Sequence, residues 1–222
     1  APANATCVDP STLARSTAII SRSFEEPTGA RLVAGTGWFL SPDKMVTAAH
    51  VADGLALSLQ QWVRIELQQS GSRMRIDARL KRMVEARPEM MAVLALRTPP
   101  REALPLPVRA APLEVNERVL SIAYTSMRLR FADGRFVRRE TGKELEGAAL
   151  LELHDGMDRL AIDEGASGAP VVDCRGRVVG VVSGTFTQTL NVFSQPVRIS
   201  TAWQKPNVIA IATATLALGE HR

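Results

Sequence analysis

A serine stands in a short turn whose composition suits the presentation of a nucleophile. The turn comprises residues 164–170, has glycines on both sides of Ser167, and is followed by the apolar pair Val171 and Val172. Glycine adopts backbone angles that other residues avoid, so the N–H of Gly165 can point toward the same place as the N–H of Ser167. Two such donors stabilise the oxyanion that forms when a serine oxygen attacks a carbonyl carbon. The turn therefore predicts acyl-transfer chemistry at Ser167.

A candidate base for this serine lies far upstream, at the end of the stretch Val46-Thr47-Ala48-Ala49-His50. A histidine can accept the proton of a serine hydroxyl and so activate it as a nucleophile. The alternative for His50 is a buried histidine that only satisfies hydrogen bonds in the core. The other two histidines, His154 and His221, have no recognisable motif around them and are left unassigned. We therefore take His50 and Ser167 as the candidate catalytic residues.

Five stretches resemble, in the same order, motifs of the chymotrypsin/trypsin-like serine protease family, particularly its bacterial secreted and periplasmic branch. They are residues 35–41, 47–50, 165–170, 180–184 and 206–209. A Gly-x-Ser-Gly-x-Pro sequence alone is a weak signal, but five ordered matches over nearly the whole chain are a strong one. The resemblance implies an all-β fold of two six-stranded antiparallel β-barrels with a short C-terminal helix. It also implies a cleft between the barrels, with His50 from the first barrel, Ser167 from the second, and the N–H groups of Gly165 and Ser167 as the oxyanion hole.

One member of the family's catalytic triad is missing. The family has an aspartate two residues before the alanine of the strand that corresponds to residues 92–96, and this position is Met90 here. A carboxylate fixes the histidine tautomer and stabilises the imidazolium, whereas a thioether does neither, and loss of the acid lowers the rate ~10⁴-fold. Glu89 is adjacent, but neighbouring strand residues point to opposite faces. Other carboxylates that could replace the missing aspartate are Asp155, Asp158 and Asp163. Ser183 matches the serine that forms a hydrogen bond with the family's aspartate.

Two functions are consistent with these residues. The first is a serine endopeptidase weakened by the loss of the acid, and the second is an inactive relative that binds peptides or proteins. Retention of His50 and Ser167 favours the enzyme, whereas Met90 favours the binding protein. Ala166 replaces the aspartate that receives a newly cut N-terminus in the pancreatic enzymes, so activation of that kind is not expected.

The resemblance also implies a pocket for the substrate side chain before the cleaved bond. Its expected residues are Ala161, Ile162, Ser183, Gly184 and Asn207. Ala161 carries no charge at the expected base of the pocket. A small or apolar substrate side chain is therefore expected in preference to arginine or lysine.

The composition is that of an ordinary soluble globular protein, with 222 residues and a formal net charge of +4. The arginines between residues 127 and 140 alternate like the solvent face of a hairpin that turns near Asp133 and Gly134, so we expect no nucleic-acid binding. No apolar run approaches the ~20 residues that cross a bilayer. The expected partners are peptide or protein substrates or ligands, no cofactor or metal is implied, and the sequence does not predict an oligomeric state.

The first residues resemble a mature chain after removal of a signal peptide, which predicts a secreted or periplasmic protein. Cys7 and Cys174 suit neither a metal site nor a redox Cys-x-x-Cys pair. In an exported protein we expect a disulfide between them, the alternative being two unrelated thiols. We divide the chain into an N-terminal arm (1–14) with a turn at residues 9–11, a first barrel (15–98), a proline-rich crossover (99–115), and a second barrel with a C-terminal helix (116–222).

Overall fold

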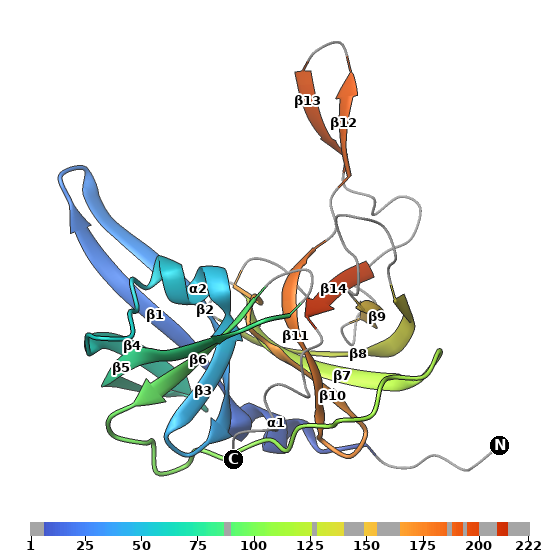
Figure 1. Cartoon of the computed structure of the whole chain (residues 1–222), viewed down its shortest axis with the longest axis horizontal. Helices are drawn as coiled ribbons and strands as arrows, with labels where there is room; N and C mark the ends of the chain where they lie inside the picture. The colour runs from blue at the N-terminus through green and yellow to red at the C-terminus, as the bar shows by residue number, and fades with distance from the viewer. Residues whose placement is uncertain are drawn as a thin grey trace.

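β-Strands form most of the structure, which is a computed structural model. It describes residues 7–86, 90–125, 128–139, 149–154, 165–185, 188–192, 195–199 and 208–212, with side chains as far as residue 182. Two closed six-stranded barrels of antiparallel strands lie side by side (Figure 1). The predicted two-barrel fold is therefore confirmed. The predicted C-terminal helix, residues 213–220, lies outside the described residues.

The first barrel contains six strands in the order β1-β2-β3-β6-β5-β4, closed by pairing of β4 with β1. Alternate side chains such as Ile65, Leu67 and Ile76 are buried in its interior, because successive strand residues face opposite sides of the sheet. The strands are β1 (Thr17–Glu26), β2 (Gly29–Ser41), β3 (Lys44–Ala48), β4 (Val63–Gln69), β5 (Ser72–Val84) and β6 (Met91–Leu96).

The second barrel has the order β10-β11-β14-β9-β8-β7 and is closed by pairing of β7 with β10. A separate hairpin of two further strands projects away from it (Figure 1). The barrel strands are β7 (Arg118–Thr125), β8 (Arg128–Arg139), β9 (Ala149–His154), β10 (Pro170–Asp173), β11 (Val178–Thr185) and β14 (Val208–Ala212), and the hairpin strands are β12 (Gln188–Val192) and β13 (Gln195–Ile199).

A third hydrophobic cluster joins the two barrels. It contains Trp38, Val46 and Met91 from the first barrel with Leu120 and Val172 from the second. The crossover between the barrels is bonded to both of them. The N–H of Leu106 donates to the carbonyl of Phe39 (2.9 Å), and Val108 forms a bridge with Val178.

Two short helices flank the first barrel. The predicted turn at residues 9–11 is wrong, because Asp9 is the N-cap of α1 (Pro10–Ser16) and its Oδ1 accepts the N–H of Ser11 at 2.7 Å. Asp9 and Pro10 are both typical of a helix start, because the aspartate side chain accepts an N–H that the first turn leaves unpaired, and proline has no N–H to leave unpaired. The second helix, α2 (Ala49–Gly54), follows β3 directly and was not predicted. Among the described helices, none is long and apolar enough to cross a membrane.

Gly134 corrects a second prediction, that of a hairpin turn near Asp133. Strand β8 continues through this position, and Gly134 pairs with Val119 on one side and Leu153 on the other. A Cβ at Gly134 would lie 1.6 Å from the carbonyl oxygen of Glu152. The glycine is therefore needed for the close approach of β9 and does not form a turn.

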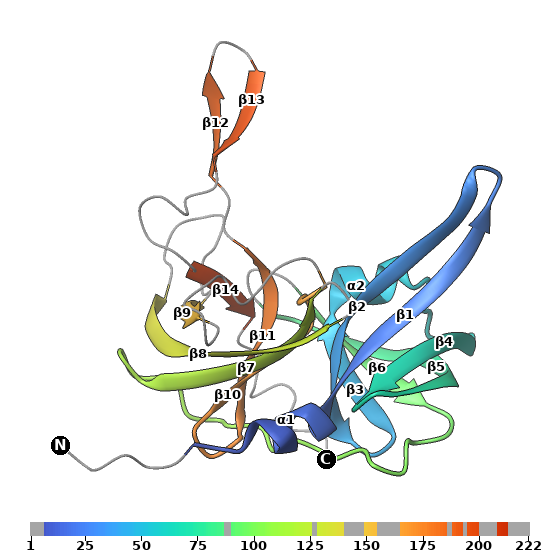
Figure 2. The same ribbon diagram turned by 180° about the vertical axis from the view of Figure 1, so that it is seen from behind.

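The hairpin of β1 and β2 extends well beyond the first barrel (Figure 2). Strand β1 pairs with β4 through residues 19–21, whereas beyond Ser21 the described chain pairs it with β2 alone. Near the tip, the guanidinium groups of Arg22 and Arg31 lie over the ring of Phe24, at 4.6 and 4.9 Å from its centre. This projecting ribbon is therefore a two-stranded element with two free edges.

Candidate active site

Ser167 lies in a tight turn immediately before β10, as the sequence predicts. The turn contains two glycines with left-handed backbone angles, Gly165 (φ 94°) and Gly168 (φ 91°), which other residues rarely adopt. The N–H of Gly168 donates to the carbonyl of Val182 (2.8 Å), and the N–H of Val182 donates to the carbonyl of Ala169 (2.9 Å). The backbone around Ser167 is thereby fixed to β11.

Thr36, in β2 of the first barrel, binds this turn from the other side. Its N–H donates to the carbonyl of Ser167 (2.9 Å), and its Oγ1 donates to the carbonyl of Gly165 (2.7 Å). The same hydroxyl oxygen accepts the N–H of Tyr124 from β7 at 3.1 Å. The side chain of Thr36 is fully buried, so one threonine joins the serine turn to both barrels.

Gly168 is where the turn comes closest to the first barrel. A Cβ built on it would lie 2.0 Å from the carbonyl oxygen of Thr36, 2.3 Å from Oγ1 of Thr47 and 3.0 Å from the backbone nitrogen of Ala48. The Thr47 hydroxyl in turn donates to the carbonyl of Thr36 at 2.7 Å. There is no space for a side chain at Gly168, and the turn lies directly against the end of β3.

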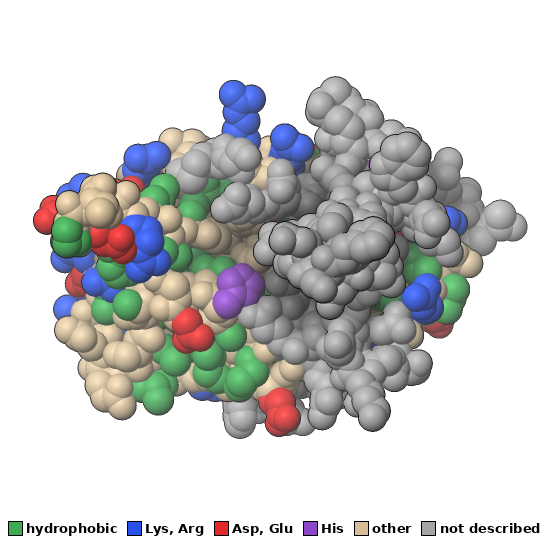
Figure 3. All heavy atoms as spheres, turned by 90° about the horizontal axis from the view of Figure 1, so that it is seen from above, with side chains coloured by type: hydrophobic (Ala, Val, Ile, Leu, Met, Phe, Trp, Pro, Cys, Tyr) green, Lys and Arg blue, Asp and Glu red, His purple; other side chains and the backbone are tan. Residues whose placement is uncertain are grey.

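His50 is the second residue of α2, two positions beyond Ala48. Val51 and Ala52 of the same helix are buried in the core of the first barrel, whereas His50 is exposed. The packing of Gly168 against Ala48 therefore places the serine turn beside the start of the helix that carries His50. A histidine is also visible on the face in Figure 3, next to residues that are not described.

Met90 lies beside this helix start, immediately before the first residue of β6. Its carbonyl oxygen accepts the N–H of Ala49 at 3.0 Å, and the next residue, Met91, pairs with Ala48. The Met90 side chain is 42% exposed, whereas that of Met91 is 1% exposed. The other candidate acids, Glu89, Asp155, Asp158 and Asp163, lie outside the described residues.

The expected specificity pocket is described only in part. Ser183 and Gly184 lie in β11, and Gly184 pairs with Ala210 of β14. Ala161, Ile162 and Asn207 fall outside the described ranges. Within those ranges, no group of three or more histidine, cysteine, aspartate or glutamate residues could hold a metal ion.

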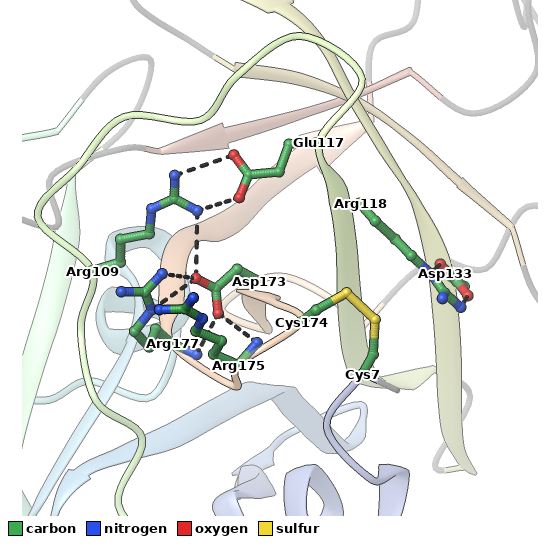
Figure 4. The surroundings of a disulfide bond; sticks show 9 residues. All are labelled: Cys7, Arg109, Glu117, Arg118, Asp133, Asp173, Cys174, Arg175 and Arg177. Carbon is green, nitrogen blue, oxygen red and sulfur yellow. Dashed lines mark hydrogen bonds and ion pairs between the residues drawn. A yellow bond between two sulfur atoms is a disulfide. The ribbon is translucent and has the colours of Figure 1, made fainter. Parts of the chain in front are cut away.

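A charge cluster lies at the opposite end of β10, around the buried Asp173 (Figure 4). Oδ1 of Asp173 accepts the backbone N–H groups of Arg175 (2.9 Å) and Arg177 (3.0 Å), while Oδ2 accepts Nε of Arg177 (2.8 Å). Arg109 of the crossover also reaches Oδ2 (3.4 Å) and forms an ion pair with Glu117. Sequence reasoning missed this cluster, although a single acid directly after the apolar pair Val171 and Val172, close to two arginines, was a usable signal.

The charges of this cluster change the proton affinity of both carboxylates. Burial is the largest influence on Asp173 and raises its pKa, but the hydrogen bonds from Arg177 and Arg175 together lower that pKa below its ordinary value. The pKa of Glu117 is also lowered, because its bonds to Arg109 and to the backbone of Glu114 outweigh the effect of burial. Both groups therefore favour the charged state.

The predicted disulfide between Cys7 and Cys174 is confirmed. Cys174 follows Asp173, so the covalent link and the charge cluster lie at the same end of β10 (Figure 4). The N–H of Val8 also donates to the carbonyl of Cys174 at 2.9 Å. The N-terminal arm is thus attached to the second barrel by a covalent bond and a hydrogen bond.

Two barrels with a glycine-flanked serine turn at their junction are the architecture of a protease-type protein. The sequence model of the trypsin-like peptidase domain matches residues 35–181, and the chain belongs to this family. The predicted resemblance is therefore confirmed. A search of curated protein sequences gave no significant match.

Several solved structures share the fold. The Rv3671c protease of M. tuberculosis in its inactive form has 20% sequence identity and a TM-score of 0.60, with 95% of this chain and 92% of that chain covered. Its active form has 18% identity and a TM-score of 0.59, covering 97% and 91%. Deg5 has 22% identity and a TM-score of 0.56, covering 79% of this chain and 82% of its own.

Proposed function

We propose that the protein is a serine endopeptidase in which Ser167 is the nucleophile and His50 is the general base. The observation that carries this proposal is the packing of the Ser167 turn against Thr36, Thr47 and Ala48, beside the helix that bears His50. Membership of the trypsin-like peptidase family supports the same reaction class. Peptides or proteins are the corresponding substrates.

In this proposal His50 accepts the proton of the Ser167 hydroxyl as the serine oxygen attacks the peptide carbonyl carbon. The N–H groups of Gly165 and Ser167 stabilise the resulting oxyanion, and such a donor contributes ~3 kcal/mol to the transition state. His50 then gives the proton to the leaving amine, and water hydrolyses the acyl-enzyme in a second cycle. The left-handed Gly165 and Gly168 support this role, because they let the turn stay this close to both barrels.

Met90 makes the expected activity low. With a thioether in the acid position, nothing at this residue holds the Nδ1–H tautomer of His50 or stabilises its imidazolium, which costs ~10⁴-fold in rate. The replacement of the acid by Met90 therefore supports a second candidate, a protein that binds peptides at the same site without cleaving them.

The disulfide supports location in an oxidising compartment, because such bonds persist there and are rare in the cytosol. We place the protein outside the cell or in the periplasm. Small or apolar side chains remain the proposed preference of the specificity pocket, on the strength of the uncharged Ala161.

The test is covalent labelling with a fluorophosphonate, comparing the wild type with Ser167→Ala and Met90→Asp. The endopeptidase proposal expects slow labelling of the wild type, none of Ser167→Ala, and much faster labelling of Met90→Asp. Labelling that persists in Ser167→Ala would exclude Ser167 as the nucleophile. Labelling of Met90→Asp alone would favour the binding protein.

A further inference from the structure

We infer that Met90 is a modification site, at which oxidation of the thioether to the sulfoxide activates the pair formed by His50 and Ser167. The inference rests on the proposed function and deepens it, because it assigns a regulator to the same site. On this inference, Met90 is a residue whose oxidation state controls activity, and not merely the loss of the catalytic acid.

Exposure makes Met90 the methionine most open to oxidants among those described. Its side chain is 42% exposed, whereas Met45 and Met91 are fully or almost fully buried. Met74 and Met83 are partly buried against the core of the first barrel. Oxidation of methionine follows exposure, so a peroxide should reach Met90 before these others.

The backbone places Met90 next to the proposed base. Its carbonyl accepts the N–H of Ala49, the residue that immediately precedes His50. Met91 packs in the cluster between the barrels, and Ala92 packs in the first-barrel core together with residues of α2. Met90 immediately precedes β6, and extending the strand's alternation by one residue places Met90 on the side of Ala92, where α2 lies.

A sulfoxide supplies the hydrogen-bond acceptor oxygen that the thioether of Met90 lacks. Sδ of methionine is three bonds from Cα, as an aspartate oxygen is, and a sulfoxide oxygen is one bond further, as in glutamate. That oxygen accepts hydrogen bonds and cannot donate them, so it selects the same Nδ1–H tautomer of His50 that a carboxylate selects. It carries no net charge, so it does not fully replace the carboxylate in stabilising the imidazolium.

The reaction needs only a peroxide as oxidant. A sulfur lone pair of Met90 attacks a peroxide oxygen, an S–O bond forms and the O–O bond breaks. Sulfur loses two electrons, and hydrogen peroxide is reduced to water. Methionine sulfoxide reductases reverse the change, so the modification can act as a switch.

The experiment measures the rate of fluorophosphonate labelling before and after limited treatment with hydrogen peroxide, with the oxidised residue identified by mass spectrometry. The wild type, Met90→Leu and Met90→Asp are compared. We expect oxidised wild type to label about 10-fold faster than the reduced protein, a small part of the ~10⁴-fold effect of a carboxylate. Treatment with methionine sulfoxide reductase should restore the slow rate, and Met90→Leu should not respond to peroxide.

Each other result has a defined meaning. If Met90 is oxidised without faster labelling while Met90→Asp labels rapidly, the switch is wrong and the proposed function stands. If Met90→Leu accelerates as much as the wild type, another residue responds to peroxide and the inference is overturned. If Met90→Asp does not label at all, the proposed function fails, and the inference fails with it.

Discussion

The two ends of β10 are held in place by different forces. At its beginning, the turn of Ser167 is fixed by neutral backbone hydrogen bonds and by the steric fit of Gly168 against Thr36 and Thr47. At its other end, Asp173 is held by charged hydrogen bonds, and Cys174 by a disulfide. The strand that connects these two regions, Pro170–Asp173, is only four residues long.

Because of this difference, the two ends of β10 should respond to different changes in conditions. Amide hydrogen bonds and close packing change little with mild acid or reductant, so the geometry of the serine turn should be robust. Carboxylate pairing depends on pH, and a disulfide depends on the redox potential of its surroundings. Stability should therefore respond to acid and reductant at one end of β10, while the turn at the other end responds to steric substitution.

The largest expected effect is loss of the disulfide. Replacing both cysteines by serine frees a loop with a sequence separation of 167 residues, which in the chain-entropy model lowers the free energy of unfolding by about 5 kcal/mol. Urea denaturation with and without a thiol reductant measures this. The reductant should destabilise the wild type and leave the Cys7→Ser, Cys174→Ser protein unchanged. Equal stability of the wild type and the double variant would show that the disulfide contributes nothing to stability.

Gly168→Ala tests the steric end of the comparison. The added Cβ meets Thr36 and Thr47, and overpacking of about 1–3 kcal/mol adds to about 1–2 kcal/mol for the left-handed backbone. We expect the midpoint of urea unfolding to fall accordingly and labelling of Ser167 to be lost. Gly71→Ala is the matched control, because Gly71 also has a positive φ (83°) but nothing lies within 4 Å of its Cβ position. Similar losses in both variants would refute the steric argument.

Asp173→Asn tests the charged end. Removing one member of a buried ion-pair cluster costs about 3 kcal/mol, because Arg109 and Arg177 lose their shared partner. The control Asp133→Asn removes an exposed pair with Arg118 and should cost less than about 1 kcal/mol. Denaturation at neutral pH compares them, and equal costs would mean that burial of the Asp173 cluster has no energetic importance.

Asp173→Asn also tests how the stability of the protein depends on pH. The pKa of Asp173 is lower in the folded protein than its ordinary value of 3.8. Its contribution to stability is therefore fully present above that value and is lost as the pH falls through the folded pKa. Below about pH 4, the wild type should lose stability more steeply than Asp173→Asn. Parallel acid unfolding curves would contradict this prediction.

The smallest expected effect is that of Thr47→Val. Its hydroxyl donates to the carbonyl of Thr36 at 2.7 Å, and the loss of such a bond costs about 1 kcal/mol. Thr17→Val is the control, because Oγ1 of Thr17 is buried without a hydrogen-bond partner in the described structure, so its removal should be neutral or stabilising. The thermal unfolding midpoint of Thr47→Val should therefore fall below that of the wild type, whereas the midpoint of Thr17→Val should stay the same or rise.

The sequence predicted the parts of this molecule that local patterns encode. Glycines around Ser167 located the turn, and the ordered motifs around it predicted the two barrels. Helix α2 was missed because residues 49–54 are too few to show a helical period. Gly134 was misjudged as part of a turn, since a glycine needed for close strand approach looks the same in sequence. The bonds of Thr36 to Ser167 and Tyr124 join distant segments, and no local pattern contains them.

The projecting ribbon of β1 and β2 can open without disturbing the rest of the fold. Beyond Ser21 it pairs with itself alone in the described chain, so its cross-strand amides should exchange with deuterium long before those of the barrels. Its exposed tip, Pro27 and Thr28, should also tolerate an inserted affinity tag. The protein can then be attached to a solid support by this ribbon, with the barrels left in their native form.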